Sequence, residues 1–202
     1  MLETLNHIDI QIFLFLNDLN TPWLDKAMYL ITNKFVWIPL YIFIIILIFR
    51  RYRLRGITGI ILIVIAISLS DYLTSGIMKP FFERLRPCHN PAISDLIHLV
   101  TNCGGKYGFA SGHAANSFTL ASSLFLIYGK QIKYLGWMYL WASIVAYSRI
   151  YVGVHYPFDV ITGSLIGIVL SILMCIIYTK LPNNFRHGEL TANTITSKTI
   201  LH

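Results

Sequence analysis

A long uninterrupted apolar run is the feature that most limits what this chain can fold into. Residues 35–49 read FVWIPLYIFIIILIF and contain no charged side chain. With the apolar residues 28–31 just before it, the run can reach the ~20 residues that a helix needs to cross a bilayer. Charged residues make up 12% of the 202-residue chain, about half of the ~25% typical of a soluble domain. The composition therefore favours a lipid-facing surface, in a chain of one domain.

Four more apolar stretches follow, at residues 56–78, 113–128, 132–148 and 158–178. We therefore predict an all-α polytopic membrane bundle of about five transmembrane helices, with the membrane domain at residues 35–181. Within the N-terminal segment 1–34, residues 5–20 alternate apolar and polar positions and are too polar to span. That pattern fits either an amphipathic helix at the membrane interface or a helix packed on the bundle. The polar tail 182–202 is predicted to be disordered.

The charges between these stretches predict how the bundle is oriented. Arginine and lysine cluster at residues 50–55, at residues 129–133 and in the tail, all on one side of a five-helix arrangement. Because cytoplasmic loops carry an excess of these residues, that side is expected to be cytoplasmic. Residues 79–112, which read as a loop, and the turn 149–157 then fall on the extracytoplasmic face of the cell (inner) membrane. The first residues include an acid, Glu3, and no basic stretch, so no cleavable signal peptide is expected.

The net charge of +7 points to an anionic partner. Nucleic acid would need a solvated basic face, whereas the cations here stand in short clusters between apolar stretches. We therefore expect the bilayer and an anionic substrate as partners, and no nucleic acid. The sequence leaves the oligomeric state open.

Three polar segments of the predicted extracytoplasmic face carry the residues that chemistry would need. Lys79, Arg86 and Arg149 place three cations beside hydrocarbon, where charge is costly and usually marks function. Their natural partner is a multiply charged oxyanion, to which an arginine can donate two parallel hydrogen bonds. Ser111 and Gly112 precede a predicted helix, and the free N–H groups at a helix start bind phosphate.

Two histidines and one aspartate add reactive groups to this anion site. Pro157 suits the first turn of the last predicted helix, which places His155 just before that helix. Asp159, four residues later, can reach the ring of His155, fix its tautomer and leave the other ring nitrogen as a nucleophile. His113 is then available to protonate the leaving oxygen. The set predicts phosphoryl transfer that needs no metal ion or other cofactor.

The same segments resemble the three signature motifs of the type 2 phosphatidic acid phosphatase superfamily, which also contains the vanadium haloperoxidases. The family pattern is Lys-x6-Arg-Pro, then Pro-Ser-Gly-His, then Ser-Arg-x5-His-x3-Asp. The segments that begin at Lys79 and Ser148 match fully, whereas the middle segment has Ala110 in place of the proline. That proline would preset the turn before the helix, so we expect a modest loss of rigidity and retained activity. The resemblance covers roughly residues 55–178.

The resemblance implies a phosphatase that acts on a membrane lipid phosphate. His155 would attack phosphorus and form a phosphohistidine, and Asp159 would orient it. His113 would protonate the departing lipid oxygen and then activate water. The phosphoryl oxygens would be held by Lys79, Arg86, Ser111, Gly112 and Arg149. Undecaprenyl diphosphate is the first-choice substrate, with phosphatidylglycerol phosphate, phosphatidic acid and the phosphates of lipid A as alternatives.

Other functions stay open at this point. A lipid phosphotransferase would pass the same phosphoryl group to an acceptor other than water. A non-catalytic binder or transporter would hold lipid phosphate without chemistry, but binding needs only the cations and not His113, His155 and Asp159. A haloperoxidase-like oxidase would be soluble, which the five predicted spans argue against.

Residues outside the motifs have alternative interpretations. Cys88 and Cys103 either pair across a ~15-residue loop in an oxidising compartment or remain free thiols. Asp71, inside the second predicted span, is either functional or a buried partner of a cation or a tyrosine, and we favour the structural role. His89 and His98 are expected to be solvated loop residues, because no convergent metal ligands accompany them.

Overall fold

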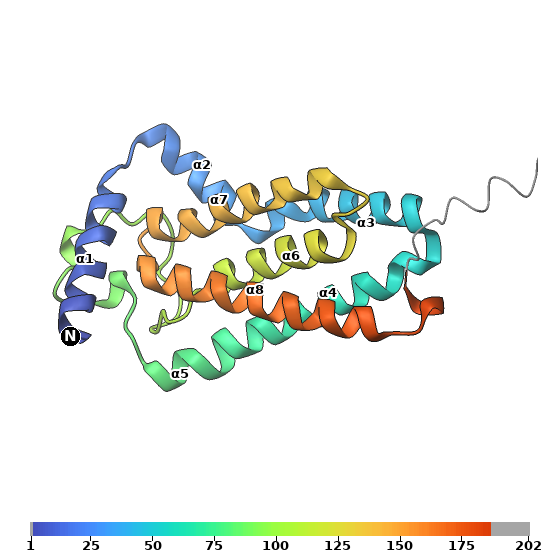
Figure 1. The fold of residues 1–202 in the computed structure, drawn as a ribbon. Helices are drawn as coiled ribbons and strands as arrows, with labels where there is room; N and C mark the ends of the chain where they lie inside the picture. Colours follow the sequence, from blue (N-terminus) through green and yellow to red (C-terminus); the bar gives the residue numbers. More distant parts are fainter. Residues whose placement is uncertain (1, 187–202) are drawn as a thin grey trace, which may run out of the picture.

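A computed structural model describes residues 2–186, and this part of the chain is a bundle of helices joined by turns (Figure 1). The helices are α1 (Leu2–Asp18), α2 (Pro22–Thr32), α3 (Ile38–Tyr52), α4 (Ile57–Asp71), α5 (Lys79–Phe82), α6 (Gly112–Tyr128), α7 (Met138–Tyr151) and α8 (Pro157–Lys180). The predicted all-α fold is confirmed. Of the tail predicted to be disordered, Asn183–Phe185 form a 3-10 turn, and residues 187–202 lie outside the described residues.

Helix α6 lies at the centre of the bundle, in contact with α4, α7 and α8. On α8, Gly163 and Gly167 face α6 one turn apart. A Cβ at Gly163 would come within 2.4 Å of the Ser111 carbonyl oxygen, and one at Gly167 within 2.4 Å of the Ala115 carbonyl oxygen. Small residues at this spacing let helices approach closely in lipid. The close contact holds the start of α6 beside the start of α8, which brings the second and third motifs together.

The surface of the bundle is apolar where a soluble protein would carry charge. Exposed side chains on α3, α4 and α8 include Phe43, Ile46, Ile61, Ile65, Leu165, Val169 and Leu173. Two stretches, Lys34–Phe82 and Pro157–Lys180, are long and apolar enough to cross a membrane. The first of them contains both α3 and α4, which run as two separate arms joined by the turn Arg53–Gly56 (Figure 1). The membrane-bundle class is confirmed, and the count of five spans stays a prediction.

Three boundaries differ from the predicted ones. Residues 28–31 belong to α2, because Asn33 ends that helix and its side chain accepts a hydrogen bond from Phe35 N. Helix α4 continues through the π-helical segment Tyr72–Met78 into α5, so the predicted loop begins at Glu83 and not at residue 79. Helix α7 runs to Tyr151, so Arg149 is helical. Hydrophobicity predicts where the chain meets lipid, whereas local hydrogen bonds decide where a helix ends.

Helix α1 lies across one end of the bundle (Figure 1). It buries Asp9, Phe13 and Asn17, which are spaced four residues apart and so share one face. Ile8, Phe15 and other apolar side chains of the helix are exposed. Helix α1 is therefore packed on the bundle, and its placement at the membrane interface stays a prediction.

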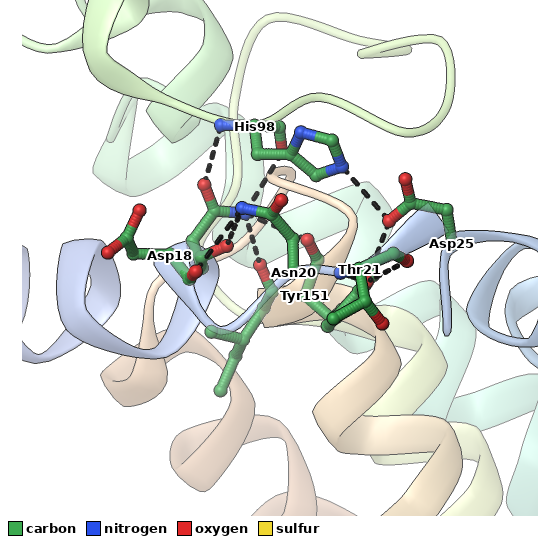
Figure 2. Close-up of polar contacts among 8 residues, drawn as sticks. Asp18, Asn20, Thr21, Asp25, His98 and Tyr151 are labelled. Atoms are coloured by element: carbon green, nitrogen blue, oxygen red, sulfur yellow. Dashed lines mark hydrogen bonds and ion pairs between the residues drawn. The ribbon is translucent and has the colours of Figure 1, made fainter. Parts of the chain in front are cut away.

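A polar cluster ties the junction of α1 and α2 to the rest of the fold (Figure 2). The Asn17 amide donates to the Tyr151 carbonyl (2.8 Å), and its oxygen accepts from His98 N (2.7 Å). Asp25 Oδ1 accepts from Tyr151 Oη (2.6 Å) and lies 3.0 Å from His98 Nε2. The His98 side chain, expected to be solvated, is 35% exposed and also contacts Asp25, because the N-terminal segment packs over its loop. His89 is exposed, as expected.

Candidate active site

One cavity of about 520 Å³ has a polar end and an apolar end. The polar end carries six of the predicted site residues: Lys79, Arg86, Gly112, His113, Arg149 and His155. The apolar end is lined from α3 and α4 by Tyr41, Ile44, Ile45, Ile48, Ile60, Ile63, Val64 and Ile67. The other two predicted residues, Ser111 and Asp159, are fully buried beside the polar end. The fold thus gathers three distant sequence segments around one space.

The turn between α7 and α8 positions His155. The backbone N–H groups of Val154 and His155 both donate to the Arg149 carbonyl at 3.2 Å, so the turn folds back onto α7. Gly153 has a φ of +84°, and a Cβ there would lie 3.0 Å from the His98 carbonyl oxygen. Only glycine meets both conditions without strain. Pro157 occupies the first turn of α8, as predicted, and the His155 residue is 1% exposed.

Asp159 lies against the ring of His155, as its spacing predicts. Its Oδ2 is 3.4 Å from His155 Nδ1 and accepts a hydrogen bond from Tyr156 N (3.0 Å). Its Oδ1 accepts from Arg84 Nη1 (2.7 Å). Among residues 2–186, His155 Nδ1 has no completed hydrogen bond, so the contact with Asp159 is an electrostatic one at this distance. With Nδ1 toward Asp159, Nε2 is the ring nitrogen left for chemistry.

The surroundings of His155 also set its charge. Burial is the largest cause that holds its pKa well below the ordinary value of about 6.5, and the nearby cations Arg149, Arg86 and Lys79 act in the same direction. The imidazole is therefore neutral near neutral pH. A neutral imidazole has one nitrogen without a proton, and that nitrogen can act as a nucleophile.

The second motif forms the N-terminus of α6. Ser111 is the N-cap, and its backbone N–H donates to the Asp159 carbonyl (2.9 Å), which joins the second motif to the third. The Ser111 hydroxyl is buried and has no hydrogen-bond partner in the part of the chain that the structure describes. A Cβ at Gly112 would lie 3.3 Å from Thr74 Oγ1, so this corner of the cavity is tightly packed. Ala110, in the place of the family's proline, is fully buried.

The first motif is held by the loop that follows it. Arg86 Nη1 donates to the Cys103 carbonyl (2.7 Å), and its Nε donates to the Tyr107 carbonyl (3.2 Å). Cys103 forms a disulfide with Cys88, which is one of the two alternatives left open by the sequence. Lys79 Nζ donates to Ser75 Oγ (3.2 Å) one turn earlier. The disulfide therefore fastens the loop segment that orients Arg86.

Arg149 reaches across to the N-terminal segment. Its Nη1 donates to Thr32 Oγ1 at the end of α2. Its Nε is buried and lacks a hydrogen-bond partner among the described residues. Nη1 of this guanidinium therefore binds the N-terminal segment, and Nε remains available to donate a hydrogen bond to a ligand.

The sequence motifs do not identify Arg84 as a site residue, because it stands at a variable position between Lys79 and Arg86. Arg84 lies between two buried carboxylates, at 2.7 Å from Asp159 and 2.6 Å from Asp9. A usable signal was Asp9, which shares a helix face with Phe13 in an otherwise apolar pattern. Asp71 was expected to be a buried partner of a cation or a tyrosine. It is instead exposed on the cavity wall, where its Oδ1 accepts a hydrogen bond from Asn116 Nδ2 (3.2 Å).

Known lipid phosphatases are similar to this chain in sequence. The lipid A 4'-phosphatase of Bacteroides thetaiotaomicron is 36% identical over 171 residues, which are 83% of this chain and 75% of that protein. An undecaprenyl-diphosphatase of Sulfolobus acidocaldarius is 39% identical over 143 residues, 70% of this chain and 63% of that protein.

Two crystal structures are similar in three dimensions. Aquifex aeolicus LpxE has a TM-score of 0.56 at 29% identity, over 82% of this chain and 93% of that one. The transmembrane PAP2 type phosphatidylglycerolphosphate phosphatase of Bacillus subtilis has a TM-score of 0.68 and the same fold, at 24% identity over 89% of each chain. The sequence pattern of the PAP2 superfamily matches residues 57–183, which include all three motifs. The chain therefore belongs to the PAP2 superfamily.

Proposed function

We propose that this protein is a membrane lipid phosphatase that works through a phosphohistidine at His155. The observation that carries the proposal is the cavity in which cations and histidines face an apolar wall. An oxyanion suits the polar end, and a hydrocarbon chain suits the apolar end. A phosphate attached to a lipid has both parts.

The reaction takes two steps. His155 Nε2 attacks phosphorus as the bond from phosphorus to the lipid oxygen breaks, and His113 gives a proton to that oxygen. Water, deprotonated by His113, then attacks phosphorus and releases inorganic phosphate, which leaves His155 free. Asp159 stabilises the positive charge that the His155 ring carries between the steps.

The phosphoryl oxygens are held by cations and by the start of α6. Lys79, Arg86 and Arg149 face the cavity, and Gly112 places the N-terminus of α6, with its free N–H groups, on the cavity wall. Arg149 Nε and Ser111 Oγ are buried donors without partners in residues 2–186, so both are available to phosphate. Donors that meet developing charge are worth ~3 kcal/mol each.

Two substrate classes lead. Undecaprenyl diphosphate, the first choice from sequence, is supported by the undecaprenyl-diphosphatase relative. A lipid A-type phosphomonoester is supported by two relatives named lipid A 4'-phosphatase, 36% and 34% identical over 83% and 84% of this chain. Asp71 favours the monoester: its Oδ1 would lie 3.8 Å from a Cβ at Gly112, where it can accept hydrogen bonds from sugar hydroxyls and repel a second phosphate.

We place the active site on the extracytoplasmic face. The motifs gather at the end of the bundle crossed by α1, whereas the basic turn after α3 and the C-terminal end of α8 lie at the opposite end (Figure 1). The Lys- and Arg-rich end is the cytoplasmic one by the positive-inside rule. A disulfide near the site fits an oxidising compartment.

The test is phosphate release by purified protein in detergent with excess EDTA. The panel is lipid A, undecaprenyl diphosphate, phosphatidylglycerol phosphate and phosphatidic acid, each also given to the His155→Ala variant. We expect release that the variant abolishes, fastest with the glycolipid monoester, and a relative gain for the diphosphate in Asp71→Asn. No release from any member by folded protein would contradict the proposal. Transfer that requires an added lipid acceptor would favour the phosphotransferase.

A further inference from the structure

Helix α1 buries an acid at the edge of the active site. Asp9 is 0% exposed, although it belongs to the N-terminal segment and to none of the three motifs. Its Oδ1 accepts a hydrogen bond from Phe158 N (3.0 Å) in the first turn of α8, and its Oδ2 accepts from Arg84 Nη2 (2.6 Å). A buried carboxylate is costly unless it is paired. Asp9 is therefore a specific contact of α1 with the third motif.

Arg84 connects this acid to the aspartate beside the proposed nucleophile. One terminal nitrogen of its guanidinium binds Asp9 and the other binds Asp159 Oδ1 (2.7 Å). The guanidinium also lies 4.2 Å from the ring centroid of Tyr156. With Oδ1 held in this way, Oδ2 of Asp159 remains directed at His155 Nδ1 (3.4 Å).

The charges show why both partners are needed. Burial raises the pKa of Asp9, and the hydrogen bond from Arg84 opposes that shift. Burial also lowers the pKa of Arg84, but Asp159 and Asp9 outweigh it, so the net shift is upward and the guanidinium stays charged. Without Arg84, two buried carboxylates would face each other, and one would take up a proton. Without the Asp9 charge, Arg84 would keep one ion pair, with Asp159, beside its contacts with the Tyr156 ring and the exposed Asn6.

We propose that Asp9 and Arg84 are a positioning pair that aims Asp159 at His155, with the Arg84 charge opposing protonation of Asp159. The inference rests on the proposed function and adds to it Asp9, outside the family motifs, and Arg84, at a variable position inside the first motif. It also gives α1 a role in catalysis: the helix supplies the outer member of a chain that runs from Asp9 through Arg84 and Asp159 to His155. Neither Asp9 nor Arg84 is among the residues that line the cavity.

Single substitutions should lower turnover and leave substrate binding nearly unchanged. We expect kcat to fall on the order of 10-fold in Asp9→Asn and 100-fold in Arg84→Gln, as for residues that orient reacting groups through another residue. The KM should stay within about two-fold, because neither residue contacts the cavity. The matched control is Asn6→Ala, which removes an exposed acceptor of the same Arg84 Nη2 at 3.1 Å and should keep wild-type turnover.

The decisive variant is the double substitution Asp9→Asn/Arg84→Gln. Removal of the Asp9 charge relieves the repulsion that Arg84→Gln creates, so the double variant should be more active than Arg84→Gln alone. The acid limb of kcat should move to higher pH in Arg84→Gln and back in the double variant. If the pair were merely structural, the losses in kcat would be additive and the acid limb would stay at the same pH. Additive losses, or an Arg84→Gln enzyme with wild-type kcat, would overturn the inference.

A second readout separates this inference from the proposed function. In ¹⁵N-histidine NMR, His155 should carry its proton on Nδ1 in the wild type and lose that preference in Arg84→Gln. If the wild type cleaves no lipid phosphate, the proposed function fails, and these signals alone decide the positioning role. Unchanged His155 signals in both Asp9→Asn and Arg84→Gln would refute it.

Discussion

At the scale of single residues, His155 combines a carboxylate on one side with three cations on the other. Asp159 contacts its Nδ1, while Lys79, Arg86 and Arg149 share its cavity. The aspartate fixes the orientation of the ring, and the cations together with burial keep it unprotonated. A bound phosphate would neutralise the same cations. The residue is thus neutral before substrate binds and tolerates positive charge once phosphate is present.

This arrangement predicts a pH profile. A depressed pKa means that the reactive neutral form persists below the ordinary histidine pKa of about 6.5. As pH falls from 8 to about 6, kcat/KM should therefore change only as the substrate phosphate itself titrates. The measurement compares two lipid phosphates whose phosphate groups ionise at different pH values. An acid limb near pH 6.5 common to both would contradict the neutral, buried His155.

The three motifs could be predicted from sequence because the residues within each motif stand only a few positions apart. The spacing of His155 and Asp159 puts both on one side of a helix start, and Ser111 stands at a predicted N-cap. Arg84 could not be assigned in this way, because its role depends on an aspartate 75 positions earlier and another 75 positions later. Only the fold shows that both carboxylates converge on one guanidinium.

At the scale of elements, the loop between α5 and α6 acts as a support for Arg86. Its carbonyls at Cys103 and Tyr107 accept hydrogen bonds from that side chain, and the Cys88–Cys103 disulfide closes the loop. The sequence left this disulfide undecided, because spacing alone does not show whether two cysteines meet.

Loss of the disulfide should affect both stability and substrate affinity. We expect Cys88→Ser/Cys103→Ser to lower the free energy of unfolding by ~3 kcal/mol, as for a closed loop of about this length. The KM for lipid phosphate should rise several-fold, because Arg86 loses its fixed carbonyl partners. Thermal unfolding and steady-state kinetics check the two effects. The control is Cys175→Ser, which removes the free cysteine of α8; equal behaviour of the two variants would contradict the role of the loop.

Helix positions followed from hydrophobicity, but their ends did not. The stretches 113–128 and 158–178 agree closely with α6 and α8. By contrast, the π-helical segment Tyr72–Met78 carries the helix past Lys79-Pro80, where a proline normally suggests a break. As a result, Lys79 lies on a helix instead of at the start of a loop.

At the scale of the whole molecule, the candidate active site and the basic turn lie at opposite ends of the bundle. The motif-bearing ends of α6, α7 and α8 meet at the end of the bundle that α1 crosses, and the basic turn between α3 and α4 lies at the far end (Figure 1). An apolar belt of exposed side chains lies between the two ends. Alternating spans would produce this arrangement, and the positive-inside rule is the ground on which we propose that the basic end is cytoplasmic.

Thiol labelling in intact cells tests that direction. In a Cys175→Ser background with the disulfide intact, a membrane-impermeant reagent should label Asp95→Cys, an exposed position in the loop near the site. The same reagent should not label Arg51→Cys, an exposed position in the last turn of α3 beside the basic turn, until the membrane is permeabilised. The reverse pattern would place the active site in the cytoplasm.

The central claim is that His155 carries the phosphoryl group during turnover. The most direct measurement is rapid quenching of the protein in alkali after mixing with a lipid phosphate in EDTA, followed by mass spectrometry of the peptide that spans residues 149–159. We predict a phosphoryl adduct on His155 that forms before steady-state phosphate release and is absent in His155→Ala, which should not turn over. Phosphate release by His155→Ala at a rate near that of the wild type, or an adduct on a different residue, would contradict the account.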